Sequence, residues 1–471
     1  MRKVSIQAVV TCMVLAVTMS SANATWYGAN YPVDVIINAG NPQPWTADEI
    51  VYNGSANKVN GPGFWDNTII VESTAAPVTS GRLYVGATGG NLSGKLIIDG
   101  SSWTASSVLH LGQNASNGAN GDELSVVEIK NGGSLIVAGT EMGKNGGGRL
   151  IIDGGTFSTG SGHFSGSGPG NTSVTVRNGG TGTSGFTSLG EQGGSGTSTL
   201  NVEGPGSLWT GHTFYMGGAT RSASLNITDG GTVLADHFFC SQGTELCDVT
   251  ISGAGSSLNA GYNVLIGEVG PGQVTIEEGG MFTISNLGIA GGAAVDVMST
   301  ATLIFGIGNG SKISVTGNKN ATIHDGATIG ATPDSSFTPE VGLAYDLVTV
   351  EDGTLTVTPA NLVLDLNALD GNSAAAGFLS LNGGGTALQL TLTDTGQGDT
   401  TLTQVDNVNA VFFDFNSVSG FEYDLESSTN MADWVFTGLI VTGDGGTMSV
   451  FDPTGTDTNK SYRLSITGTG P

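Results

Sequence analysis

The chain has 471 residues, 78 of them glycine, and its 14 basic against 40 acidic side chains give a formal net charge of −26. This charge excludes nucleic acid and anionic lipid head groups as main partners, because both surfaces are themselves negatively charged. Abundant glycine with few aromatic residues would suit disorder, but regular alternation of Val, Leu and Ile through much of the chain excludes that for most of the sequence.

Residues 1–24 have the features of a secretory signal peptide. Arg2 and Lys3 precede an apolar stretch at residues 8–19 that is too short to span a bilayer, and Ala22-Asn23-Ala24 fits a cleavage site. We therefore expect an exported chain that begins near Thr25. Residues 25–69 contain three tryptophans and no repeat, and we expect them to form an N-terminal cap over the first strand edge.

One short pattern returns through residues 70–331. It consists of an apolar residue, any residue, an apolar residue, a polar residue and a glycine turn, as in LIIDGG from Leu150. Copies begin about 24 residues apart, and a second marker, an apolar residue followed by glycine, comes about fifteen residues after each start, as at Leu111-Gly112. The ten starts are Leu96, Val127, Leu150, Val174, Leu200, Leu225, Val249, Val274, Val295 and Ile313.

This pattern predicts an all-β chain built around a parallel β-helix, or β-solenoid, of about ten rungs. Apolar residues alternate with a period of two, glycines mark corners, and no helical period occurs. A single repeat cannot bury its apolar side, whereas stacked repeats form a continuous core. Each repeat offers two or three short strands, so the sequence leaves open whether the solenoid has two or three faces.

The C-terminal part changes character twice. Residues 332–407 contain longer alternating strands and predict a closing β section. Residues 408–471 contain short strands separated by Gly, Asp and Asn turns, which predicts a small antiparallel β-sandwich. Through YDLESSTN, Trp434, FDP and YR, this segment is similar to a C-terminal module of exported proteins from environmental bacteria, which implies docking to a secretion system or to the envelope.

The repeats resemble those shared by type V secretion (autotransporter) passengers and by bacterial surface proteins that carry a Pro-Glu-Pro C-terminal sorting tag. The resemblance covers about residues 70–330 and rests on the V-x-V-x-x-GG and LG-x-x-x-G elements. It implies a parallel β-helix at the bacterial surface and carries little information about activity. The chain ends SITGTGP, without that tag and without room for a translocator barrel, so we expect neither anchoring route of the family.

The polar residue three positions after each start is the first place to look for chemistry. Over five neighbouring repeats its charge alternates in sign, and opposite charges placed opposite each other on adjacent strands stabilise a sheet. We interpret these residues as a structural charge ladder and not as catalysts. The ladder consists of Asp99, Lys130, Asp153, Arg177 and Glu203.

Histidines suggest one candidate metal site. His212 and His237 each lie twelve residues after a repeat start, which predicts that they stack on successive rungs beside Asp236, with His163 at nearly the same offset two rungs away. Two imidazoles and a carboxylate suit Zn²⁺. Surface histidines aligned by repetition are the interpretation we favour, so we expect neither a metal nor another cofactor.

Two cysteines remain after signal cleavage. Cys240 and Cys247 are close in an exported chain, which predicts a disulfide. Cys240 occupies the slot filled elsewhere by Leu189, Met216 and Ile266, so both cysteines should point inward and close the SQGTEL loop.

These observations predict an exported structural or adhesive β-solenoid protein of the bacterial surface or extracellular matrix, without catalysis. Its polar Ser, Thr, Asn and Gly faces suit extracellular glycans or other copies of the chain as partners. Two alternatives remain. A glycan-active enzyme, a polysaccharide lyase or hydrolase, would need clustered carboxylates on adjacent rungs, and a passive spacer would present residues 408–471 as its binding module.

Overall fold

The structure is a computed structural model of the whole chain. The expected signal peptide and most of the expected N-terminal cap lie outside the residues that it describes. No helix among the described residues is both long enough and apolar enough to cross a membrane. The described residues are 26–27, 35–37, 39–40, 50–51, 68–85, 94–112, 125–144, 146–165, 170–190, 194–285, 294–335, 337–370, 375–394, 411–417, 421–430, 433–443, 446–452 and 461–466.

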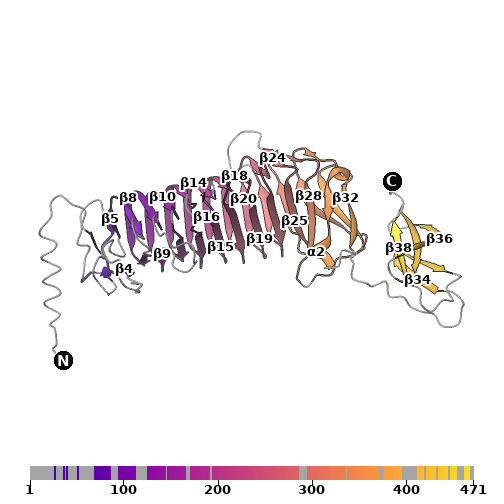
Figure 1. Cartoon of the computed structure of the whole chain (residues 1–471), viewed down its shortest axis with the longest axis horizontal. Coiled ribbons are helices and arrows are strands. Elements are labelled where there is room, and N and C mark those ends of the chain that lie inside the picture. The colour runs from indigo at the N-terminus through magenta and orange to yellow at the C-terminus, as the bar shows by residue number, and fades with distance from the viewer. Residues whose placement is uncertain are drawn as a thin grey trace, which may run out of the picture.

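The predicted fold is confirmed: parallel strands stack into a β-solenoid of about nine turns (Figure 1). One strand from each turn, together with further strands at the two ends, forms a 13-stranded sheet, which we call the first face. Its strands are, in order, β2 (Val35–Ile37), β4 (Thr68–Glu72), β7 (Lys95–Asp99), β9 (Ser125–Lys130), β11 (Gly148–Asp153), β13 (Thr172–Arg177), β15 (Thr197–Glu203), β17 (Ser222–Thr228), β19 (Cys247–Ser252), β22 (Gly272–Glu277), β25 (Ala301–Ile307), β28 (Thr328–Pro333) and β31 (Val363–Asp365).

The remaining solenoid strands form a 20-stranded sheet. Its ladder also includes the strands that close the solenoid at its C-terminal end. In chain order they are β1 (Trp26–Tyr27), β3 (Ile50–Val51), β5 (Val78–Ser80), β6 (Leu83–Val85), β8 (Ser102–Leu111), β10 (Ser134–Met142), β12 (Thr156–His163), β14 (Thr181–Leu189), β16 (Leu208–Met216), β18 (Thr232–Cys240), β20 (Ser257–Ala260), β21 (Val264–Ile266), β23 (Met281–Ile284), β24 (Ala294–Val297), β26 (Lys312–Val315), β27 (Asn320–Ile323), β29 (Ala344–Val350), β30 (Leu355–Thr356), β32 (Ala376–Leu381) and β33 (Ala387–Asp394).

A corner divides the long strands of this sheet in two. In β18, Ala235 and Phe238 are buried while Asp236 and His237 between them both face outward, so the alternation changes phase at the corner. One turn later, β20 and β21 pair with the two halves of β18 as separate strands. The solenoid therefore has three faces: we call the part before the corner the second face and the part after it the third face.

Eight of the ten predicted repeat starts, Leu96 to Val274, lie opposite one another in the first face. The last two assignments were wrong, because Val295 pairs with Val264 and Ile313 with Phe282 in the other sheet. The row of equivalent apolar residues on the first face continues instead through Leu303 and Ile329. An apolar-any-apolar triplet occurs on every face, so the triplet alone does not identify the face once turn lengths change.

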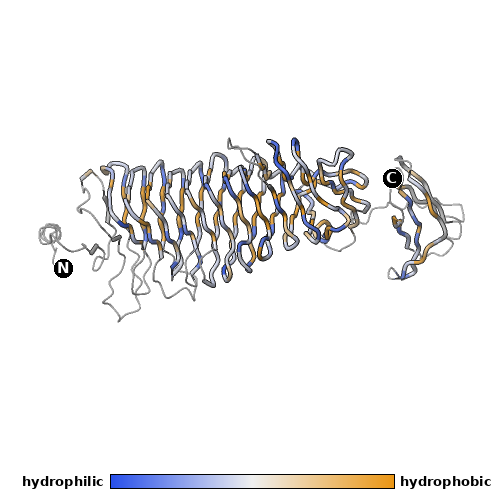
Figure 2. Tube along the Cα trace, turned by 90° about the horizontal axis from the view of Figure 1, so that it is seen from above, coloured by the Kyte–Doolittle hydropathy of each residue, from blue (hydrophilic) through white to orange (hydrophobic). Residues whose placement is uncertain are grey.

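The interior is a single apolar core that runs through all the turns, with hydrophobic and hydrophilic residues alternating along the chain (Figure 2). Inside this core, a small residue on one turn can lie opposite a large one on the next. Trp209 is fully buried and lies opposite Gly182, where a Cβ would meet the indole ring at 2.2 Å. A small residue on one rung therefore makes room for a large one on the next.

The two ends of the solenoid differ. At the N-terminal end, β1, β2 and β3 continue both sheets by parallel pairing, so residues of the expected cap contribute strands to the ladder itself. At the other end, β33 pairs antiparallel with β29 and then with β32. The short helices η1 (Pro359–Asn361) and α2 (Asn367–Asp370) flank β31 there.

The C-terminal part is antiparallel, as predicted. It contains a two-stranded sheet of β34 (Val411–Asn416) and β37 (Thr447–Asp452), and a three-stranded sheet in which β35 (Glu422–Ser428) lies between β36 (Val435–Thr442) and β38 (Ser461–Ile466). Buried Leu425 packs with Phe415, Val441, Tyr462 and Leu464 in a small core of its own.

Candidate functional site

The charge ladder forms as predicted along the ends of successive first-face strands. Asp99, Lys130, Asp153, Arg177 and Glu203 follow one another in register. Lys130 Nζ lies 3.4 Å from Asp99 Oδ2, and Arg177 Nη2 lies 2.9 Å from Asp153 Oδ2. The carboxylates of Asp99 and Asp153 are therefore paired with neighbouring rungs, which supports a structural role, while Glu203 is in register with Arg177.

Asparagines in the adjoining turns complete these pairs. Asn178 Nδ2 donates a hydrogen bond to Asp153 Oδ1 at 2.5 Å, and Asn131 Nδ2 donates one to Asp99 Oδ1 at 2.7 Å. Both asparagines have φ near +54°, a left-handed conformation that asparagine adopts more readily than most residues. The bond from Asn178, reinforced by Arg177, lowers the pKa of Asp153 despite partial burial.

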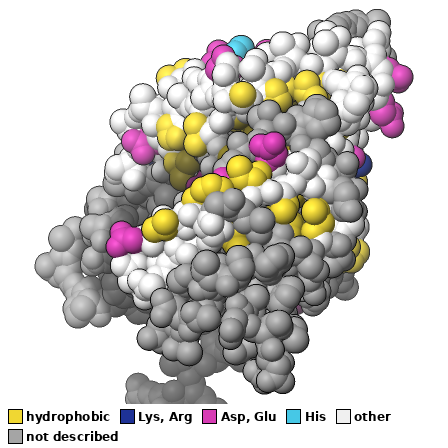
Figure 3. Space-filling model, turned by 90° about the vertical axis from the view of Figure 1, so that its right-hand side faces the viewer, with side chains coloured by type: hydrophobic (Ala, Val, Ile, Leu, Met, Phe, Trp, Pro, Cys, Tyr) yellow, Lys and Arg dark blue, Asp and Glu magenta, His cyan; other side chains and the backbone are white. Residues whose placement is uncertain are grey.

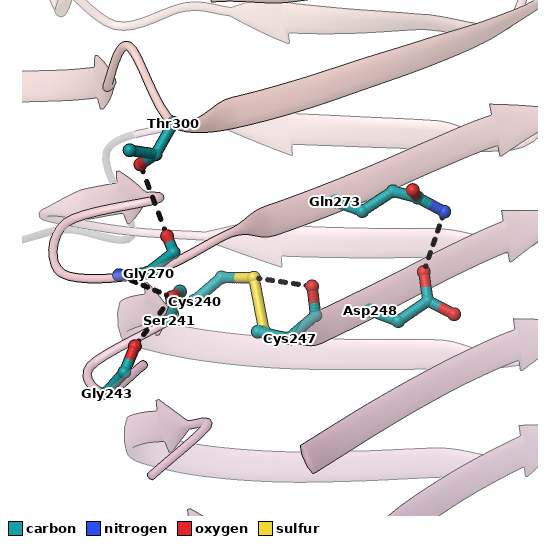
Figure 4. Close-up of a disulfide and its surroundings, with 8 residues drawn as sticks. All are labelled: Cys240, Ser241, Gly243, Cys247, Asp248, Gly270, Gln273 and Thr300. Carbon is teal, nitrogen blue, oxygen red and sulfur yellow. Dashed lines mark hydrogen bonds between the residues drawn. A yellow bond between two sulfur atoms is a disulfide. The ribbon is translucent and has the colours of Figure 1, made fainter. Parts of the chain in front are cut away.

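The predicted disulfide is present and lies in the core. Cys240 and Cys247 are bonded, fully buried, and have Cα atoms 5.7 Å apart (Figure 4). Cys240 lies level with Met216 and Ile266, as its place in the repeat predicted. In the loop that the bond closes, Ser241 adopts φ +71°. Its hydroxyl donates a hydrogen bond to the carbonyl oxygen of Gly243 and accepts one from the N–H of Gly270.

All five histidines belong to the third face or its corner. His110 and His163 lie in β8 and β12, His212 and His237 at the corner in β16 and β18, and His324 directly after β27. Three of them contact a carboxylate on a neighbouring turn: His110 with Glu141, His212 with Asp236, and His324 with Asp296.

The predicted stacking of His212 on His237 was wrong by one residue. His212 lies level with Asp236, and Thr213 lies level with His237. The cause is the turn at residues 204–207, which is one residue longer than the equivalent turn at residues 229–231. Counting residues from the first-face start therefore gives the wrong level for any residue after a turn of different length. His163 lies level with Ser188 and does not join the histidine pair.

The three residues of the candidate metal site still meet, but as a histidine–carboxylate contact beside a second ring. His212 Nδ1 contacts Asp236 Oδ2, and the rings of His212 and His237 lie edge to face with centroids 5.7 Å apart. Burial and the neighbouring His212 lower the pKa of His237, while Asp236 opposes this. Among the described residues, no three His, Cys, Asp or Glu side chains are placed to hold a metal ion.

A cluster that the sequence reasoning missed lies on the first turns of the third face. Tyr84, His110 and Glu141 occupy one level of three successive turns. The rings of Tyr84 and His110 stack with centroids 4.6 Å apart, and His110 Nδ1 lies 3.1 Å from Glu141 Oε2. Each residue directly precedes an apolar-glycine marker, so counting back from that second marker would have found them.

Aromatic rings continue this face towards the C-terminal turns. Tyr215 and Phe239 stack with centroids 4.9 Å apart, and His237 and Tyr262 stack at 5.1 Å. These separations match the distance between paired strands, about 4.8 Å, so the rings stack along the axis of the solenoid. Ring faces therefore cover one another and ring edges face solvent, which is unfavourable for stacking a sugar on a ring face.

No protein-family model matches the sequence, and no curated protein matches it either. The function proposed below is therefore drawn from the residues of this chain.

Proposed function

We propose that this chain is an exported structural or adhesive rod of the bacterial surface or extracellular matrix, and not an enzyme. The observation that carries this proposal is the second face. At one outward level of that face, hydroxyl side chains occupy three successive turns, at Ser158, Thr183 and Thr210. Thr104 lies at the same level beyond Ile136, and Thr283 lies there beyond Leu234 and Asn259. The hydroxyl side chains named next make no side-chain hydrogen bond within the described part of the chain. They are Thr104, Ser158, Thr183, Thr210 and Thr283.

Such a face suits contact with a hydroxyl-rich polymer. Each hydroxyl can donate one hydrogen bond and accept two, and each contact is weak by itself because it replaces a bond to water. Repetition at about 4.8 Å along the solenoid allows many weak contacts to act together. The carboxylates of Asp99 and Asp153 and the stacked ring faces make contacts within the protein, which favours this face as the binding surface.

The test is binding by the mature chain, residues 25–471, to a glycan array and to whole bacterial cells, with release of reducing sugar measured alongside. We expect binding without sugar release. Replacement of Thr104, Thr183, Thr210 and Thr283 by valine should weaken binding about tenfold or more, because valine keeps the shape and loses the hydrogen bonds. Released sugar would overturn the proposal.

The matched control replaces outward threonines of the first face. Thr175, Thr250 and Thr275 lie on that sheet in equivalent outward positions. Their replacement by valine should leave glycan binding unchanged. Equal loss in both variants would show that no particular face carries the binding.

A glycan-active enzyme is the second candidate, and the cluster on the first turns favours it. The His110 side chain is 10% exposed, contacts the Glu141 carboxylate and stacks on Tyr84. A histidine oriented by a carboxylate suits general acid-base chemistry. Sugar release from a polysaccharide panel that disappears in His110→Gln, with the unfolding midpoint unchanged, would select this candidate.

A further inference from the structure

Strand β36 is an open edge of the three-stranded C-terminal sheet. The strand order is β36-β35-β38, so one side of β36 pairs with β35 and the other has no strand partner among the described residues. Its sequence, VFTGLIVT, contains no charged residue and no proline. Charged side chains and proline usually protect a sheet edge from pairing with another chain, and β36 has neither.

Three apolar side chains of β36 are also exposed. Val435 is 65% exposed, Phe436 45% and Ile440 53%. Figure 3 shows this end of the molecule, where hydrophobic side chains lie on the surface in several separate groups between polar ones. Val435 and Phe436 are consecutive, so they point to opposite faces of the sheet, and both faces beside this edge expose apolar side chains. A further strand added at the edge would cover part of both.

The opposite edge of the same sheet is different. Strand β38 carries Arg463 near its middle, where the guanidinium contacts Glu426 at 2.6 Å and lies 4.5 Å from the centre of the Trp434 ring. A charge at this place disfavours pairing with a further strand. The β38 edge of this sheet therefore carries a charged residue, whereas the β36 edge carries none.

We propose that β36 pairs with β36 of a second copy of this chain, antiparallel about a two-fold axis. Unpaired backbone N–H and C=O groups along an edge are complemented by another extended strand. Because the strand has no charge, pairing it with itself places no like charges opposite each other. The axis passes beside Ile440, so the two Ile440 side chains meet across it, as in an isologous contact.

The acidity of the chain opposes this contact only from a distance. Glu422, Asp424 and Glu426 lie on β35, one strand inward from the open edge. Repulsion between two acidic copies is screened over about 8 Å at physiological ionic strength. The association should therefore strengthen as salt is added, whereas a contact made by opposite charges would weaken.

The register of β36 limits the length of the pairing. An irregularity between Phe436 and Ile440 interrupts its pairing with β35. The straight part available for a partner is consequently short, and the dimer should be weak and dependent on concentration. This deepens the proposed structural role by naming the partner, because such pairing joins two rods through their C-terminal modules.

The experiment is sedimentation equilibrium of the mature chain over a wide range of concentration at low and high salt. We expect a reversible dimer that tightens with salt. Ile440→Lys places a charge on the edge and should raise the dissociation constant of the dimer about tenfold or more. Val269→Lys is the matched control, because Val269 is 56% exposed on a solenoid turn. A chain that stays monomeric, or a dimer unaffected by Ile440→Lys, overturns the proposal.

A second variant keeps the test decisive if Ile440→Lys disturbs the module. Ile440→Cys preserves an uncharged side chain and should form a disulfide-linked dimer on mild oxidation, while Val269→Cys should not. Equal cross-linking of both variants, or of neither, contradicts pairing through β36. Glycan binding by monomeric Ile440→Lys is measured separately, so failure of the rod proposal and failure of the pairing proposal are distinguishable.

Discussion

At the scale of single residues, the solenoid interior depends on side chains of neighbouring turns fitting together, and Gly182 is the clearest case. Gly182→Ala places a methyl group within 2.2 Å of the fully buried Trp209 ring. We expect the free energy of unfolding to fall by about 1 to 3 kcal/mol, because the ring has to move in a packed core. Denaturant unfolding measures this loss.

Gly383→Ala is the control for that substitution. Gly383 lies in the turn between β32 and β33, where an added Cβ meets no atom within 4 Å. The same change of residue should leave stability unchanged or raise it slightly, through a less flexible unfolded chain. Equal destabilisation by the two substitutions would contradict the packing argument.

A second prediction at this scale concerns His237 and pH. Burial lowers its pKa below the ordinary value of 6.5. The unfolded chain therefore binds the proton first as the pH falls, so the stability from neutral His237 is present above about pH 6.5 and decreases below it until the folded pKa is reached. His237→Phe keeps the stacked ring without the proton, and should make the unfolding midpoint less dependent on pH between about pH 7.5 and about pH 5.

His324→Phe is the control for this pH series. It removes an exposed imidazole close to the same face. An identical change of the pH profile in both variants would show that His237 is not the source.

At the scale of elements, the charge ladder links strands that are already paired through their backbones. In a double-mutant cycle, Asp153→Asn and Arg177→Gln should show a coupling of about 0.3 to 1 kcal/mol that decreases with salt, because both side chains are partly exposed. The pKa of Asp153 is lowered, so its contribution is present above about pH 4 and is lost as the pH falls further. Zero coupling at low salt would contradict a stabilising ladder.

The disulfide acts on a single corner of the solenoid. Reduction and alkylation, or Cys240→Ala with Cys247→Ala, should lower the free energy of unfolding by about 2 kcal/mol, because the bond closes only a short loop. Limited proteolysis should then cut within residues 241–246, where Leu246 is 42% exposed. If the protease cuts distant turns earlier in time than this loop, the bond stabilises more of the solenoid than its own corner.

At the scale of the whole molecule, two separate cores predict two separate unfolding events. The solenoid core and the small core around Leu425 share no residue. Calorimetry of the mature chain should show two transitions, and deletion of residues 411–471 should remove one without moving the other. A single transition that shifts as a whole on deletion would show that the two parts unfold together.

Much of this architecture could be predicted because one physical rule operates on every turn. The apolar positions from Leu96 to Val274 and the ladder from Asp99 to Glu203 follow from alternation along a strand and repetition between strands. His212 could not be placed in this way, because its level depends on the length of an intervening turn. His110 with Glu141 was missed because it is tied to the second marker and not to the first.

The longer turn before β16 has a consequence for how such a chain can change over generations. The extra residue at 204–207 is absorbed at the corner, while the strands on both sides keep their pairing with the turns above and below. An insertion or deletion in such a turn thus leaves the strand pairing on both sides intact and changes only the length of the turn itself. Mutation can therefore alter the surface turns of the solenoid while the core sequence stays the same.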